Sequence, residues 1–140
     1  MLTNETALQA WTPRILSVLR IVAALVFLQY GLSKYFGFPA HPPANFTMFS
    51  LLGLAGAIEL VGSLFLLVGL FSRETAFIMS GEIAVAYFMR KAPISFFPQV
   101  NGGGLEVLIC FVFLFLFFAG PGPWSVDARW RPTASRGPTT

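Results

Sequence analysis

One apolar stretch, from Leu51 to Phe71, limits the folds open to this chain more than any other feature. A membrane-spanning α-helix needs roughly 20 mostly apolar residues, and this stretch is long enough. Its single charged residue, Glu59, lies close to the middle. A central carboxylate costs on the order of 2.5–3.5 kcal/mol on insertion scales, so such a group usually has a partner or a task. We therefore predict a membrane helix that carries an acid into the membrane interior and packs closely through Gly53, Gly56, Gly62 and Gly69.

Composition points to lipid as the solvent of the whole chain. Of the 140 residues, 56% are hydrophobic and 11% are charged, and the mean hydropathy is +0.73. The charged residues lie mostly at the boundaries of apolar segments, whereas a soluble protein of this size needs them to cover its surface. No basic stripe interleaved with aromatic residues lies outside the apolar segments. We therefore expect contact with the lipid bilayer and no nucleic-acid partner.

The pattern of apolar segments predicts an all-α membrane protein with four transmembrane helices in a compact antiparallel bundle. The bundle is expected to form one domain over residues 14–120, with spans at about 14–36, 51–71, 75–91 and 104–120. Residues 1–13 precede it as an N-terminal segment that lacks the basic start of a signal peptide. Residues 121–140 are expected to form an interfacial and disordered cytoplasmic tail.

Local signals set the expected ends of these helices. Pro13 is placed at the start of the first helix, where a proline is tolerated. Ser72, Arg73 and Glu74 are expected to form the tight polar turn of a helical hairpin. Asn101 is a candidate N-cap for the fourth span, because its side chain can accept a hydrogen bond from a backbone N–H of the first turn.

The distribution of basic residues favours both termini in the cytoplasm. With four spans, the N-terminal side, the loop after the second span and the tail share one side of the membrane. That side carries Arg14, Arg73, Arg129, Arg131 and Arg136. The opposite side carries Lys34, Arg90 and Lys91. The positive-inside rule therefore gives a modest preference for this orientation.

Two acids near the midpoints of consecutive spans form the leading candidate site. A short hairpin brings Glu59 and Glu82 to similar depth. Two carboxylates that face each other in a low-dielectric site cannot both ionise easily, so one of them is suited to take up and release protons. Arg20 is their candidate charge partner, and with it the acids would form a fixed ion cluster. A purely structural role, in which paired or protonated acids hold helices together, stays open.

Lys34 and Glu106 are secondary candidates. Lys34 lies near the end of the first span beside Tyr35, and both residues are typical of interfacial anchors. Glu106 falls in the first turn of the fourth span, where the helix dipole favours a carboxylate. Capping or solvation is enough to explain Glu106.

Other residues exclude several kinds of chemistry. His41 is the only histidine, so this chain cannot supply two axial histidines to a haem. Cys110 is the only cysteine, which excludes an intrachain disulfide and a metal site of the paired-cysteine type. The sequence has no metal-ligand cluster, phosphate-binding loop, nucleophile–histidine pair or dinucleotide-binding domain. If electrons pass, their cofactor is a membrane quinone or belongs to a partner.

Five segments carry a resemblance to a known family. They read LRIVAALVFLQYGLSKYFG, GAIELVGSLFLLVGLFSR, GEIAVAYFM, FFPQVNGG and AGPGPWSVDA. The pattern resembles the DoxX family of small four-helix membrane proteins, and the likeness covers about Arg14 to Arg129. Its most specific parts are GLSKYFG, Glu59 with the following LVG, the Asn-Gly-Gly at 101–103 and AGPGPWSxD. In the family pattern a glutamate directly follows Asn-Gly-Gly. Here Gly104 takes that position and the acid is Glu106, about 200° further round a helix.

The resemblance implies a bacterial cytoplasmic-membrane protein that works with a quinone-linked redox system. Relatives include small subunits of terminal quinol oxidase and thiosulfate:quinone oxidoreductase systems, while many members have no established activity. On this interpretation the chain is at most an accessory subunit of an oxidoreductase, and its intramembrane acids handle protons or contact quinone. Its partners would be other membrane or redox subunits, or a second copy of the chain. The alternative is a non-enzymatic scaffold, assembly factor or small-solute permeability protein whose buried acids are structural.

Overall fold

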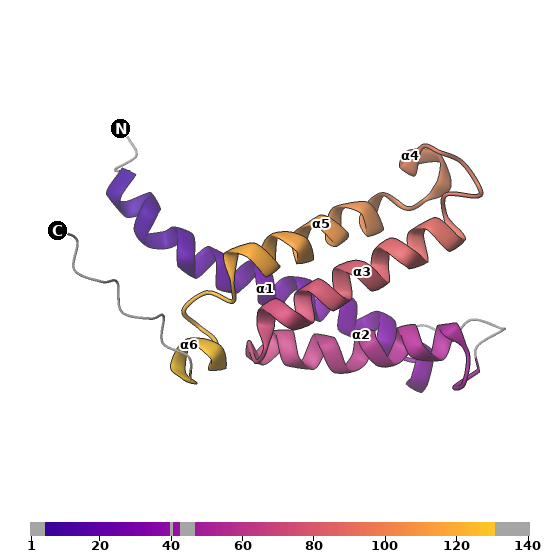
Figure 1. Ribbon diagram of the computed structural model, residues 1–140, viewed down its shortest axis with the longest axis horizontal. Helices are drawn as coiled ribbons and strands as arrows, with labels where there is room; N and C mark the ends of the chain where they lie inside the picture. The colour runs from indigo at the N-terminus through magenta and orange to yellow at the C-terminus, as the bar shows by residue number, and fades with distance from the viewer. Residues whose placement is uncertain (1–4, 40, 43–46, 131–140) are drawn as a thin grey trace.

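The computed structural model describes residues 5–39, 41–42 and 47–130, and every regular element in these ranges is a helix (Figure 1). The elements are α1 (Glu5–Phe36), α2 (Leu51–Val68), α3 (Ser72–Arg90), α4 (Pro98–Asn101), α5 (Gly104–Ala119) and α6 (Val126–Trp130). By length and composition, α1 and α2 are able to cross a membrane, and α5 is apolar but shorter. The all-helical fold class is therefore confirmed, whereas the four-span bundle stays a prediction.

Several helix ends differ from those expected. The first helix begins at Glu5 rather than near Arg14, and Pro13 lies inside it. A proline in a helix removes one backbone hydrogen bond. The first turns of α1 are exposed, so water can bind the carbonyl that is left free. At the other end of the chain, residues 126–130 of the expected disordered tail form α6, while residues 131–140 lie outside the described residues.

The connection between α2 and α3 lies three residues earlier than the sequence predicted, at residues 69–71. Gly69 ends α2 in the left-handed conformation, with φ 78°, and its N–H donates to the carbonyls of Phe65 and Leu66. Phe71 is also left-handed, with φ 50°. The helix α3 then begins at Ser72, so the polar Ser-Arg-Glu segment forms its first turn rather than the connection itself.

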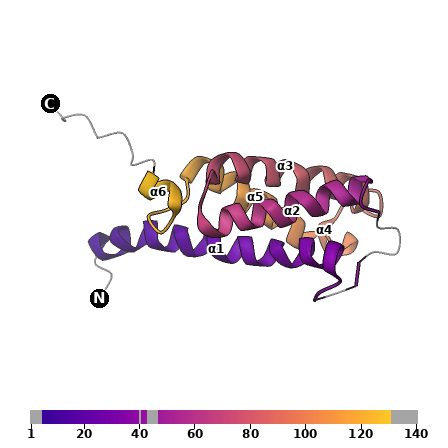
Figure 2. The ribbon, with the colours of Figure 1, turned by 90° about the horizontal axis from the view of Figure 1, so that it is seen from below.

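The four longest helices pack as two pairs. α1 lies along α2, and α3 lies along α5, while the contacts between the two pairs are less extensive (Figures 1 and 2). Gly31 permits the close approach of α1 to α2, because a Cβ atom there would lie 2.7 Å from the backbone nitrogen of Leu60. The pairs meet around Phe27 and Phe113, whose rings are in edge-to-face contact with centroids 5.3 Å apart. The buried core comprises Ala23, Ala24, Phe27, Leu66, Ala76, Met79, Ile83, Ile109, Phe113 and Leu116.

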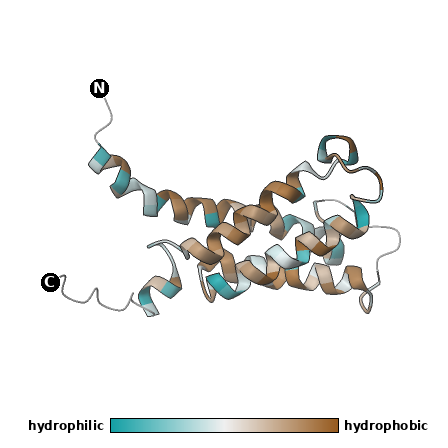
Figure 3. Ribbon diagram, turned by 45° about the horizontal axis from the view of Figure 1, so that its top comes forward, coloured by the Kyte–Doolittle hydropathy of each residue, from teal (hydrophilic) through white to brown (hydrophobic). Residues whose placement is uncertain are grey.

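The long helices are hydrophobic along most of their length (Figure 3), and many of their large apolar side chains are exposed. On α5 alone, Leu108, Phe111, Phe115 and Phe118 are all exposed. A monomeric soluble protein rarely exposes so continuous an apolar surface, because water penalises it. This belt is the surface expected where hydrocarbon chains surround a protein.

The segment after α5 is tied to the middle of α1 and to the start of α3. Arg20, which is 1% exposed, donates to the backbone carbonyls of Pro121 and Trp124, the latter at 2.8 Å. The two carboxylate oxygens of Asp127 accept the backbone N–H groups of Phe71 and Ser72 at 2.9 and 2.8 Å. These two N–H groups lie at the start of α3, where backbone donors have no intrahelical acceptor. Asp127 therefore caps α3 from the far end of the chain.

Asp127→Ala is expected to lower the thermal unfolding midpoint of the protein purified in mild detergent. Removal of a helix cap typically costs about 1 kcal/mol, and here two donors lose their acceptor. Arg129→Ala is the control, because Arg129 is exposed on the same short helix. Equal falls of the midpoint in the two variants would contradict the capping role.

Candidate functional site

A large cavity lies between the two helix pairs. Its volume is about 1190 Å³, and its walls are the C-terminal halves of α1 and α3, the N-terminal half of α2 and the first turns of α5. The walls are mostly apolar, but six charged side chains reach them: Lys34, Glu59, Glu82, Arg90, Lys91 and Glu106. The cavity is therefore a mostly apolar chamber that holds a few charged groups, a composition typical of sites that bind small organic ligands.

An ion pair joins α1 to α2 inside this cavity. The Nζ of Lys34 lies 2.7 and 2.6 Å from Oε1 and Oε2 of Glu59. Both residues are buried, with 9% and 5% of their surfaces exposed. Short charge-assisted bonds to both oxygens are the geometry that a buried pair needs to offset the loss of hydration. Lys34, predicted as a secondary candidate and interfacial anchor, is thus the direct partner of the central acid.

Glycines of α2 make room for this pair. A Cβ atom at Gly56 would lie 3.1 Å from Cδ of Lys34 and 2.9 Å from Cε2 of Tyr35. The lysine stem and the tyrosine ring therefore occupy space that a larger residue at position 56 would fill. The Tyr35 hydroxyl also donates to the carbonyl of Gly53 at 2.6 Å. The expectation that these glycines serve close helix packing is met here in a specific form.

Glu82 reaches the same cavity from α3 but is held differently. Its Oε2 atom is buried and has no hydrogen-bond partner among the described residues. It lies within electrostatic reach of Glu59, Lys34 and Arg90. A buried acceptor without a donor costs on the order of 1–3 kcal/mol, so this oxygen favours a proton or a donor from a bound molecule. The structure thus brings the two predicted acids to one chamber and leaves one of them with an open bonding position.

Arg20 is not the charge partner that we expected. Its guanidinium binds the segment after α5 from the middle of α1, whereas the cavity lies along the C-terminal half of that helix. Arg20 and Lys34 lie on one face of α1, but 14 residues separate them, or about 21 Å along a helix. The helix α2 turns back along α1. Glu59 therefore lies near the C-terminal end of α1, at the level of Lys34 and not at the level of Arg20.

Glu106 and Lys91 form the rim of the chamber. Lys91 Nζ lies 3.9 Å from Oε1 of Glu106, and both side chains are partly exposed. The exposure of this pair fits the predicted boundary position of Glu106, and the residue falls in the first turn of α5 as expected.

Asn101 does not cap α5 directly, because the N-cap is Gly103. Its side chain accepts from the N–H of Gly103 at 2.7 Å and donates to the Tyr87 hydroxyl at 3.0 Å and to the Ser95 carbonyl at 2.9 Å. It therefore fixes the connection between α3 and α5, in which the rim residue Lys91 lies.

Sequence reasoning missed several polar groups of the cavity wall. Gln29, Tyr30 and Ser33 line it from α1, and Tyr87 lines it from α3. Only Tyr30 lies one helical turn from Lys34, so the spacing along a helix could have found that residue but not the other three. His41 lies at the mouth of the cavity, and Cys110 contacts Ser80 between α3 and α5. Among residues 5–39, 41–42 and 47–130 no group of three metal-ligating side chains comes together.

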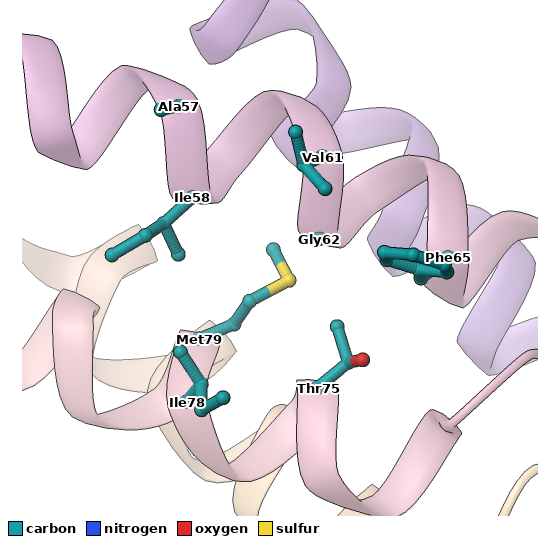
Figure 4. A pocket seen from close by; sticks show the side chains of 8 residues that line it. All are labelled: Ala57, Ile58, Val61, Gly62, Phe65, Thr75, Ile78 and Met79. Carbon is teal, nitrogen blue, oxygen red and sulfur yellow. The ribbon is translucent and has the colours of Figure 1, made fainter.

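A second, smaller hollow lies between α2 and α3 (Figure 4). Its volume is about 320 Å³, and its lining is apolar except for Thr75. Ile58 and Ile78 line both this hollow and the large cavity. The two spaces are therefore neighbours along the seam, which is the line where α2 and α3 meet.

The arrangement has two chemical capacities. Glu59 is bonded to Lys34, so its charge is balanced and its position is set. Glu82 has a carboxyl oxygen without a hydrogen-bond partner, and this oxygen can donate to the carbonyl of a ligand or accept from its hydroxyl. A carboxyl group with such an open bonding position is of the kind that can exchange a proton with a bound molecule.

Comparison with known proteins gives a consistent family match. The model of the DoxX family matches residues 15–92. An uncharacterized protein of Haemophilus influenzae is 39% identical over 127 residues, which cover 87% of this chain and 95% of the relative. No solved structure matches the chain. Together with the long apolar helices, the family match identifies a membrane protein that is in contact with the lipid bilayer.

The Lys34–Glu59 pair predicts a strong non-additivity in stability. Glu59→Leu leaves a buried ammonium without its counter-charge, and Lys34→Met leaves a buried carboxylate, so each is expected to cost about 3–5 kcal/mol. The double variant Lys34→Met/Glu59→Leu should regain most of this loss, because neither charge remains. Unfolding in mild detergent measures the cycle. Additive losses would show that the pair does not act as a unit.

Proposed function

Because the chain belongs to the DoxX family, we propose that it is an integral membrane subunit of a quinone-linked redox system. In this proposal the cavity between the helix pairs holds the head of a membrane quinone. Glu82 and Glu59 contact the head or exchange protons with it, and Lys34 fixes the position and charge of Glu59. The chain is an accessory subunit, because its own residues supply no electron carrier.

One observation carries the proposal: the buried, unpartnered oxygen of Glu82 beside a balanced ion pair in a cavity of ligand size. A carboxyl group with an open bonding position suits a quinone carbonyl, which accepts a proton, or a quinol hydroxyl, which donates one. The Lys34–Glu59 pair supplies a fixed dipole nearby, which stabilises charge that develops on a ligand oxygen.

Reduction of a quinone to a quinol consumes two electrons and two protons. A partner protein with its own redox cofactor supplies both electrons in this proposal. Glu82 donates one proton to a carbonyl oxygen of the ring, and the Lys34–Glu59 pair supplies the second proton to the other carbonyl oxygen. Both sites regain a proton from the aqueous side through the rim at Lys91 and Glu106. Oxidation of a quinol runs through the same groups in reverse, with the partner as electron acceptor.

The proposal also assigns a topology. The helices α1, α2, α3 and α5 cross the bacterial cytoplasmic membrane as an antiparallel four-helix bundle, and both termini lie in the cytoplasm. Arg73 and Arg129 then lie on the cytoplasmic side, in agreement with the positive-inside rule. The cavity, which lies toward the other end of the helices, belongs to the outer half of the membrane.

A second function is favoured by a separate observation. Both oxygens of Glu59 are bonded to Lys34, so this acid already has a sufficient role in holding α1 against α2. The chain would then be a scaffold, assembly factor or small-solute permeability protein. This alternative explains Glu59 but leaves the open oxygen of Glu82 without a task.

Glu82→Gln distinguishes the two functions. Glutamine keeps the shape of the side chain but cannot give up a proton, so quinone-dependent electron flow in membranes should fall by about a hundredfold, a typical effect of a lost acid–base group. Glu59→Gln should lower both the flow and the thermal stability, because it weakens the bond to Lys34.

Protein abundance in the membrane is measured in parallel, and Glu5→Gln serves as control because Glu5 lies on the exposed first turn of α1. Unchanged electron flow in both site variants at normal abundance would refute the redox proposal. A loss of abundance and stability without a specific loss of flow would favour the scaffold.

A further inference from the structure

The small hollow between α2 and α3 has a floor and open rims. Met79 is fully buried and forms the floor against Gly62, where a Cβ atom would lie only 2.8 Å from its sulfur. Val61 and Ile78 form rims and are 52% and 56% exposed. In Figure 4 the Met79 side chain points across the seam toward Gly62, between the side chains of Ile58 and Thr75. The absence of a side chain at position 62 therefore lets Met79 pack against α2, where it forms the floor of an apolar groove between α2 and α3 whose rims are exposed.

The groove leads to the acids. Ile58 directly precedes Glu59, and Ile78 lies one helical turn before Glu82. Both isoleucines also line the large cavity, so the groove and the cavity share a boundary. From Ile58 to Phe65 the groove follows α2 for about 10 Å. Beyond Ile58 and Ile78 the seam residues Leu54, Val85 and Met89 line the cavity itself.

We infer that this groove binds the hydrocarbon chain of the same amphiphile whose polar head occupies the cavity, and that the ligand enters sideways from the bilayer between α2 and α3. The inference rests on the proposed function for the identity of the head. The occupant is a single molecule with a ring-sized head at Glu59 and Glu82 and a flexible apolar chain over Met79.

The groove acts by shape rather than by hydrophobic affinity. Lipid chains are as apolar as the groove, so transfer of a chain from lipid into it gains little free energy. A chain attached to a seated head, however, needs an exit that does not push the head out. The seam at Ile58 and Ile78 supplies that exit, so blocking it should penalise ligands that carry a chain and spare those that do not.

The experiment compares two quinones that have the same ring, one with a decyl chain and one with a methyl group in its place. Apparent dissociation constants are measured for the full chain in nanodiscs of fixed lipid content. Val61→Trp covers the groove from its rim and should weaken binding of the decyl quinone by about tenfold, a typical cost of overfilling a packed space. Binding of the methyl quinone should stay unchanged, which also shows that the variant is folded.

Two further variants sharpen the comparison. Val22→Trp is the matched control, because Val22 is also a valine, is 51% exposed and lies on α1 outside both hollows. It should leave both affinities unchanged. Ala57→Phe fills the groove from a second position and should repeat the effect of Val61→Trp.

The outcomes separate this inference from the function on which it rests. The groove inference is overturned, with quinone binding intact, if the decyl quinone binds equally well to the unaltered protein, to Val61→Trp and to Val22→Trp. It is also overturned if Val61→Trp weakens the binding of both quinones equally. If neither quinone binds the unaltered protein, the proposed function fails first and the groove inference fails with it.

Discussion

The ion pair between Lys34 and Glu59 is the interaction on which the site depends. Two buried charges are costly to remove from water, and only short bonds to both carboxylate oxygens offset that cost. The pair ties α1 to α2 in one register, and Gly56 leaves the space in which the lysine stem lies. Once that register is set, Tyr30 and Gln29 face the cavity from α1 and complete its wall. One electrostatic requirement therefore determines which side chains can meet a ligand.

The cavity itself follows from uneven packing. The helices pack tightly within each pair, whereas the pairs meet over smaller areas, at Phe27 and Phe113 and where Met79 of α3 packs against Gly62 of α2. Beyond the contact of Phe27 with Phe113, toward the C-terminal end of α1, polar side chains take the place of core residues. Two acids cannot share a dry interface without a compensating partner. The helix pairs are therefore separated by a cavity at Glu59 and Glu82. Phe27 lines the cavity at this aromatic contact, on the side nearer to the buried Arg20.

Much of this arrangement was open to prediction from the sequence. The helical class, the family and the two central acids followed from hydropathy, from the cost of a buried carboxylate and from the motif around Glu59. The partner of that acid did not, because Arg20 and Lys34 share a helical face and only their depth separates them. The cap of α3 was equally hidden, since Asp127 acts on residues that lie more than fifty positions earlier. Contacts between distant segments carry no local signal, so periodicity and capping rules cannot find them.

The buried position of Arg20 has a consequence for how the protein is made. Its hydrogen-bond acceptors, the carbonyls of Pro121 and Trp124, are among the last groups of the described chain to leave the ribosome. Until they arrive, the guanidinium lacks the two carbonyls that satisfy it in the folded protein. The native packing around Arg20 can therefore be completed only after the segment that follows α5 has been synthesised.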